Sequence, residues 1–201
     1  MKRVLNSGTI KLPYVKGSEA DVLRYQNDLS TKEYLDIIFN GCETRLELVS
    51  FRFEIKAPLL TFLAFQDSNL GTLNRLHELD HPIAYLPPQF YTSNLESLDS
   101  KTCNAYNTKL YNFYSAAINF YNKLVTDGMC KEQAKLVLPQ GMLVNFAWTA
   151  DAGEVITFIE KFYNVSPELY GYCTTLAVYL EEHMPEAVKW LKQNRWQNIS
   201  L

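Results

Sequence analysis

Two widely separated segments of this chain alternate apolar and polar residues, and they limit the folds that it can adopt. Phe51, Phe53 and Ile55 alternate with charged residues, and a second alternating run covers 142–148. A period of two residues is typical of a strand with one buried face. Pro58 follows the first run and predicts a short apolar helix over 59–66, because proline is favoured at the first helical position.

Helical patterns occupy most of the remaining chain. Ser30 with Glu33 predicts a capped helix over 31–40, and Asp151 with Glu154 predicts another that ends near residue 162. Apolar spacing and start signals predict the other helices, which cover 104–127, 131–136, 167–183 and a last segment from residue 185. We expect a hairpin of two short strands over 3–14 and a loop around Gly71.

The order of these elements determines the fold class that we expect. Strands and helices mix without the regular alternation of a doubly wound parallel sheet, which predicts an α+β fold. No linker, repeat or low-complexity tract interrupts the 201 residues. We therefore predict a single domain over 1–201.

The charge and the cysteines exclude several classes of function. A net charge of −3 offers no positive field for nucleic-acid polymers or anionic membranes. No run approaches the ~20 apolar residues of a membrane span, and the start lacks a signal-peptide pattern, so we expect a cytoplasmic protein. The four cysteines are widely spaced, which predicts free thiols and neither a disulfide framework nor a metal site.

Three segments carry the pattern of a known family. Ala57-Pro58 and the apolar residues after it resemble the segment that precedes the signature motif of the flavin-dependent thymidylate synthases. Residues 41–53, GCETRLELVSFRF, are similar to the family's Gly-His-Glu-Ser/Thr-x-x-Glu-His-x-x-Phe-x-Phe. Residues 136–149 are similar to its Val-Leu-Pro and Phe-x-Trp-Thr segment. The chain is thus identified as a divergent member, with the α+β fold of that family.

The resemblance implies an assembly and a reaction. Family members form homotetramers with active sites between subunits, so this chain is expected to form a homotetramer or to pair with an active relative. They methylate dUMP with a methylene group from methylenetetrahydrofolate and hydride from FAD, which NADPH reduces. The resemblance therefore implies FAD and a nucleotide ligand here, and the folate and NADPH if the family reaction is retained.

The signature motif itself departs from the family pattern. Asp67-Ser68-Asn69 stands where the family has Arg-His-Arg, and Gly153, Phe162 and Tyr172 stand at further arginine positions. An aspartate about 4 Å from a phosphate costs ~4 kcal/mol at an effective dielectric constant of ~20. These losses argue against the usual nucleotide pose, and the sequence identifies no catalytic residue.

Three residues remain as candidates for the substrate site. Thr72 and Asn74 keep a hydroxyl and an amide at the family's Ser-x-Asn spacing, and Arg75 supplies a cation beside them. Arginine suits a phosphate because its planar fork donates paired hydrogen bonds. The alternative for Thr72 and Asn74 is that both bond the local loop backbone.

Three residues are candidates for the cofactor site. Thr44 and Glu47 match family positions that contact the flavin, and Cys42 replaces another residue that helps to bind it. The alternatives are that Glu47 pairs with a surface cation and that Cys42 is a small buried residue.

Two other patterns have structural explanations that we prefer. His77-Glu78-Leu79-Asp80-His81 satisfies the His-Glu-x-x-His zinc pattern, but Pro82 follows directly and prevents the helix that the pattern needs. Aromatic residues crowd the helix predicted over 104–127 and could stack on bases. Without basic companions, core and subunit packing explain them better.

Two functions therefore remain open. One is an enzyme of nucleotide metabolism that uses altered contacts to dUMP or a related nucleotide. The other is a non-catalytic structural or regulatory subunit that keeps the fold or binds a different ligand. The losses fall at charged, ligand-facing positions while caps and core spacing survive, and this selectivity favours the second.

Overall fold

The computed structural model describes residues 2–4, 8–41, 43–76, 81–94 and 96–199. Its five strands form one antiparallel sheet in the order β1-β2-β3-β5-β4. The strands are β1 (Lys2–Val4), β2 (Gly8–Lys16), β3 (Ser50–Pro58), β4 (Thr72–Arg75) and β5 (Leu143–Asp151). The strands mix with helices along the chain, as the pattern predicted, and the α+β class is confirmed.

Helices occupy most of the remaining described residues. The α-helices are α1 (Glu19–Leu23), α2 (Thr31–Gly41), α3 (Leu59–Ser68), α4 (Ser100–Thr126), α5 (Lys131–Ala134), α6 (Ala152–Phe162), α7 (Pro167–His183) and α8 (Pro185–Asn194). Two 3₁₀ helices, η1 (Glu43–Leu48) and η2 (Lys135–Val137), complete the described set. None of the described helices is both long enough and apolar enough to span a membrane.

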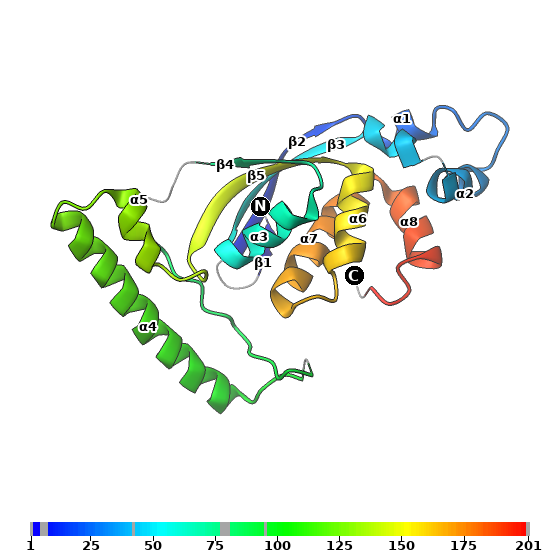
Figure 1. The fold of residues 1–201 in the computed structure, drawn as a ribbon. Helices are drawn as coiled ribbons and strands as arrows, with labels where there is room; N and C mark the ends of the chain where they lie inside the picture. The colour runs from blue at the N-terminus through cyan, green and yellow to red at the C-terminus, as the bar shows by residue number, and fades with distance from the viewer. Residues whose placement is uncertain (1, 5–7, 42, 77–80, 95, 200–201) are drawn as a thin grey trace.

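One face of the sheet carries the core. Helices α3, α6 and α7 pack against this face, while α8 packs on α7 and α2 (Figure 1). The buried face of β3 presents Phe51, Phe53 and Ile55, as the alternation predicted. The ring of Phe158 on α6 stacks on that of Phe65 on α3 at a centroid distance of 4.2 Å, which ties the helical layer together.

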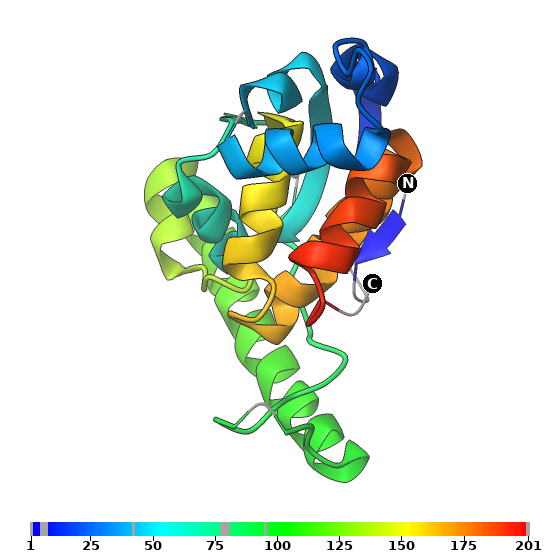
Figure 2. The ribbon, with the colours of Figure 1, turned by 90° about the vertical axis from the view of Figure 1, so that its right-hand side faces the viewer.

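We call the sheet and the helices that pack with it the body, which comprises the described residues 2–4, 8–41, 43–76 and 143–199. A second part of the chain leaves the body and returns to it. We call it the arm: the described residues 81–94 and 96–142, which include α4, α5 and η2. Figures 1 and 2 show α4 extending away from the sheet and its helices. Backbone hydrogen bonds fix the base of the arm, where Leu59 N donates to Met142 O at 2.9 Å and Tyr85 N donates to Gly141 O at 2.9 Å.

Most helix starts lie where the capping signals placed them. Ser30 and Glu33 cap α2 reciprocally, since Ser30 N donates to the Glu33 carboxylate at 2.9 Å and Glu33 N donates to Ser30 Oγ at 3.3 Å. The hairpin expected over 3–14 is confirmed by the pairing of Arg3 with Thr9, although its turn at 5–7 falls outside the described residues. Of the three described cysteines, Cys103 and Cys173 are buried, and none of the three is bonded to another.

Four segments differ from the expectation. The segment after Gly71 is not a loop throughout, because Thr72–Arg75 forms the edge strand β4 against β5. Residues 43–48 form the 3₁₀ helix η1, and α1 has no counterpart among the predicted helices. The helix predicted over 131–136 ends at Ala134 and continues as the tighter η2.

Candidate functional site

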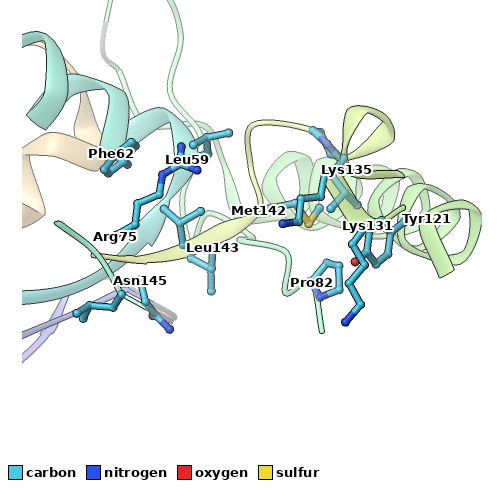
Figure 3. Close-up of a pocket in the computed structure, with 14 residues that line it drawn as sticks. Leu59, Phe62, Arg75, Pro82, Tyr121, Lys131, Lys135, Met142, Leu143 and Asn145 are labelled. Atoms are coloured by element: carbon cyan, nitrogen blue, oxygen red, sulfur yellow. The ribbon is translucent and has the colours of Figure 1, made fainter. Parts of the chain in front are cut away.

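A cavity of about 320 Å³ lies where the arm joins the body (Figure 3). Leu59 and Phe62 of α3 line it beside the end of β4, and Met142 and Leu143 line it at the start of β5. These apolar side chains come from the segments that the backbone hydrogen bonds of the arm base hold together. A concave, mainly apolar cavity with a few polar groups is the usual form of a small-molecule site.

Three cations line this cavity. Arg75 comes from the end of β4, Lys131 from α5 and Lys135 from η2. Figure 3 shows Arg75 beside Phe62 and Leu59 at one end, and the two lysines near Tyr121 at the other. No acidic residue is found among the described residues that line the cavity. The cavity therefore concentrates positive potential in a protein of negative net charge.

The Arg75 side chain is held near an aromatic ring. Its guanidinium carbon lies 5.3 Å from the centroid of the Phe62 ring, within cation–π distance. Arg75 is exposed, and the contact favours this position of its guanidinium by about 0.5–1 kcal/mol. The arginine thus has hydrogen-bond donors on the Phe62 side of the cavity.

The three predicted substrate residues do not share one face of the sheet. Successive side chains of a strand point to opposite faces, so Thr72 and Asn74 lie on one face of β4 and Arg75 lies on the other. Thr72 and Asn74 are exposed and pair with Thr149 and Ala147 of β5. Of the three, only Arg75 lines the cavity.

The turn that stands at the position of the family's Arg-His-Arg forms hydrogen bonds within the chain. Asp67 is exposed at the end of α3 and does not line the cavity, whereas Ser68 is buried and donates to Phe65 O at 2.7 Å. Asn69 adopts the left-handed conformation at the C-cap, with φ of 55°. The turn thus ends α3 and leads into β4, and its aspartate is separate from the cationic cavity.

The predicted cofactor residues lie in a different region. Thr44 and Glu47 are exposed on η1, and Cys42 falls outside the described residues. Burial raises the pKa of the Asp151 carboxyl, and the nearby charges of Glu154 and Glu47 raise it further. Three carboxylates therefore gather beside η1.

This region does not fit the flavin that the family resemblance implies. The pyrophosphate of FAD is anionic and needs cations or backbone donors. The cation on η1, Arg45, lies over the Tyr25 ring with its guanidinium carbon 4.5 Å from the ring centroid. The acidic surroundings of Glu47 oppose the pyrophosphate, so this surface of the chain is a poor FAD site.

The zinc-like motif cannot be placed. His77, Glu78, Leu79 and Asp80 lie outside the described residues, and His81 is exposed.

Sequence reasoning missed both lysines of the cavity. Lys131 and Lys135 are four residues apart, so a continuous helix would place them on one side. That spacing was the available signal. It could not show that Arg75, from a strand far away in the sequence, lines the same cavity.

Comparison of the sequence with known proteins identifies the family of the chain. The family described as "Thymidylate synthase complementing protein" matches residues 8–186. A flavin-dependent thymidylate synthase of Thermosipho melanesiensis is 24% identical over 207 residues, covering 91% of this chain and 90% of the relative. The enzyme of the same name from Thermotoga neapolitana is 22% identical over 199 residues, covering 90% and 89%.

Solved structures show the same fold. A UMP/dUMP methylase, PolB, from Streptomyces cacaoi bound with 5-Br UMP has a TM-score of 0.83 at 15% identity. The match covers 93% of this chain and 95% of that chain. The same methylase bound with 5-Br dUMP has a TM-score of 0.81.

Proposed function

The chain belongs to the thymidylate synthase complementing protein family, and from this premise we propose that it binds a uridylate-type nucleoside monophosphate in the cavity between the arm and the body. The observation that carries the proposal is the set of three cations, Arg75, Lys131 and Lys135, around one mainly apolar cavity. The structural relative PolB is described as bound with 5-Br UMP and 5-Br dUMP, which supports this ligand class.

The two ends of the cavity suit the two ends of such a ligand. A phosphate carries close to two negative charges at neutral pH, and Lys131 and Lys135 offer compact ammonium groups at the arm end. At the other end, the apolar surface of Phe62 and Leu59 suits a pyrimidine ring. The Asn145 amide carries both a donor and an acceptor, as recognition of a uracil edge requires.

We assign binding and orientation to these residues, and no chemical step. The lysines hold the phosphate, Arg75 donates hydrogen bonds toward the ring end, and the apolar residues keep water from the base. Methylation would need the family's flavin and folate, and η1 offers the pyrophosphate an acidic surface. We therefore propose a nucleotide-binding member whose methylation activity is absent unless a second subunit supplies the missing cations.

A second copy of the chain is the partner that we propose for the arm. Tyr106, Phe113 and Phe120 of α4 are spaced seven residues apart and are 43%, 59% and 51% exposed. A spacing of seven keeps them on one side of the helix. Only three of the 27 residues of α4 are charged, all of them lysines. Such a surface is typical of helix pairing between subunits, which supports the homotetramer or pairing with an active relative.

Isothermal titration calorimetry with dUMP tests whether the nucleotide binds in this cavity. Replacing both lysines, Lys131→Ala with Lys135→Ala, should weaken dUMP binding about 100-fold, or ~3 kcal/mol, because two charge-assisted contacts to the phosphate are lost. The matched control is Lys32→Ala with Lys101→Ala, which removes the same charge at exposed positions outside the cavity. Equal affinities in the two double variants would refute the site.

A separate measurement decides between the two functions. We expect dUMP binding without formation of dTMP when FAD, NADPH and methylenetetrahydrofolate are supplied. The visible spectrum of FAD mixed with the protein should remain that of free flavin, because the η1 surface repels the pyrophosphate. Formation of dTMP would establish the enzyme, and with it a flavin site that the single subunit does not provide.

A further inference from the structure

One peptide group in the turn between α3 and β4 is held at both of its polar atoms. Leu70 O accepts a hydrogen bond from Trp148 Nε1 at 2.8 Å. Gly71 N, on the other side of the same peptide bond, donates to Glu154 Oε1 at 2.7 Å. The two holding residues lie on β5 and α6, and Figure 1 shows the turn passing the start of α6.

The turn lies so close to β5 that only glycine fits at position 71. Gly71 has φ of +64°, in the left-handed region. A Cβ atom there would approach Thr149 O to 2.4 Å and Trp148 Nε1 to 2.7 Å. A residue without a Cβ can also rotate its peptide groups at little steric cost. The orientation of this peptide group therefore depends on its two hydrogen bonds.

The Trp148 indole cannot move to a different partner. Its ring is fully buried and contacts the rings of Phe53, Phe65 and Phe158 at centroid distances of 5.1 to 5.7 Å. A buried N–H without an acceptor is unfavourable, so Trp148 favours the observed position of Leu70 O. The carboxylate of Glu154 acts on the other atom of the same peptide group.

Glu154 uses both of its oxygen atoms in this arrangement. Oε2 accepts from Asp151 N at 3.0 Å, and Asp151 Oδ1 accepts from Glu154 N at 2.9 Å, which forms the capping box of α6. Oε1 remains for Gly71 N. The cap fixes the carboxylate, and the fixed carboxylate holds the turn.

The turn leads directly into the strand that carries Arg75. β4 is four residues long, lies at the edge of the sheet and has β5 as its neighbour. Its register begins with Thr72 opposite Thr149 and ends with Arg75 opposite Phe146. A short edge strand has few ladder hydrogen bonds of its own, so the position of its first residues decides whether this register is kept.

We infer that Glu154 is a positioning residue, which fixes the start of β4 through Gly71 and thereby places Arg75 at the ligand cavity. Glu154 does not itself line the cavity. The assignment rests on the proposed function for its effect on ligand binding. Its effect on β4 is independent of any ligand.

Two variants distinguish this role of Glu154 from its role in the cap of α6. Glu154→Ala removes one half of the cap, the bond from Asp151 N, together with the bond to Gly71. Asp151→Ala removes the other half of the cap, the bond from Glu154 N, and leaves the bond to Gly71 in place. Hydrogen–deuterium exchange of the amides over residues 71–76, measured without nucleotide, should be at least tenfold faster in Glu154→Ala than in Asp151→Ala. Glu154→Gln should recover part of the protection, because its carbonyl oxygen can still accept from Gly71 N.

Titration with dUMP completes the test. Glu154→Ala should weaken binding about tenfold relative to Asp151→Ala, or ~1.4 kcal/mol. Equal exchange over 71–76 in the two alanine variants would overturn the inference, and so would faster exchange with unchanged dUMP affinity. If the unaltered protein does not bind dUMP, the proposed function fails, while the exchange rates still decide whether Glu154 fixes β4.

Discussion

The body and the arm bury their aromatic residues to opposite extents. Phe53, Phe65 and Phe158 in the body are fully buried around the Trp148 ring. Tyr106, Phe113 and Phe120 of α4 are instead 43%, 59% and 51% exposed. In the body, α3, α6 and α7 cover one face of the sheet. The arm leaves these aromatic side chains of α4 exposed, and the cavity with its three cations lies where the two regions meet.

This contrast explains which family features persist. The body keeps the residues that a core and its turns need, so the fold survives at low sequence identity. Charges at exposed positions can change without cost to that core, as Asp67 shows, since it is exposed and does not line the cavity.

The largest effect is expected in the body. Phe158→Ala should lower the free energy of unfolding by ~3–5 kcal/mol, because it leaves a cavity beside Phe65 and Trp148. Urea denaturation measures this loss. Phe113→Ala on the arm is the matched control and should cost less than ~1 kcal/mol in the isolated subunit. Similar losses in both variants would contradict the distinction between body and arm.

Substitutions on the exposed face of α4 in the arm should weaken self-association of the protein. Phe113→Glu with Phe120→Glu places two charges on the exposed face of α4, and we expect association to weaken at least 100-fold, or ~3 kcal/mol. Sedimentation velocity over a range of concentrations measures the oligomeric state. Lys32→Glu on α2 is the control for added charge. An unchanged oligomer in the double variant would exclude this face as the subunit contact.

Asp67 provides a smaller test of where the phosphate binds. The sequence alone predicts that Asp67→Arg improves binding if repulsion is the cause of a lost site. Because Asp67 does not line the cavity, we now expect the dUMP affinity to change less than threefold, or below ~0.7 kcal/mol. Calorimetry measures the dUMP affinity of Asp67→Arg and of Asp67→Asn, which removes the negative charge without adding a positive one. A tenfold gain would place the phosphate at the turn after α3.

The smallest effect concerns the charge of Asp151. Burial raises the pKa of this carboxyl, with added repulsion from Glu154 and Glu47. For an acid whose pKa is raised by folding, the contribution to stability is present below the unfolded pKa and is lost as the pH rises through the folded pKa. Asp151→Asn keeps an acceptor for Glu154 N and removes this loss.

Thermal unfolding of the unaltered protein and of Asp151→Asn between pH 4 and 8 measures how their stabilities differ with pH. Relative to Asp151→Asn, the unaltered protein should lose stability as the pH rises, by less than ~0.5 kcal/mol in total because the group is about half exposed. A relative gain with rising pH would show that the carboxylate is stabilised in the fold.

Local signals predicted the fold well. The capping boxes at Ser30 and Asp151, the strand pattern at Phe51 and the serine cap at Ser166 are all confirmed. Each depends on residues within one turn or one strand. β4 was missed because Leu73 is its only apolar residue, and an edge strand this short is defined by its distant partner.

The site was only partly predictable for the same reason. Arg75 was identified beside the family motif, but its two lysine companions lie on the arm and reach the cavity through the backbone contacts of Gly141 and Met142. No local sequence pattern predicts that Arg75 and the two lysines line the same cavity. The role of Glu154 shows the same limit, since the capping box was visible in the sequence and the bond to Gly71 was not.

The central claim is that a uridylate binds between Arg75 and the two lysines of the arm. A crystal structure with 5-bromo-dUMP tests it most directly, because the anomalous signal of bromine locates the pyrimidine ring. The account predicts bromine beside Phe62 and the phosphate at Lys131 and Lys135. Bromine beside the turn at Asp67, or none bound at saturating ligand, would contradict it.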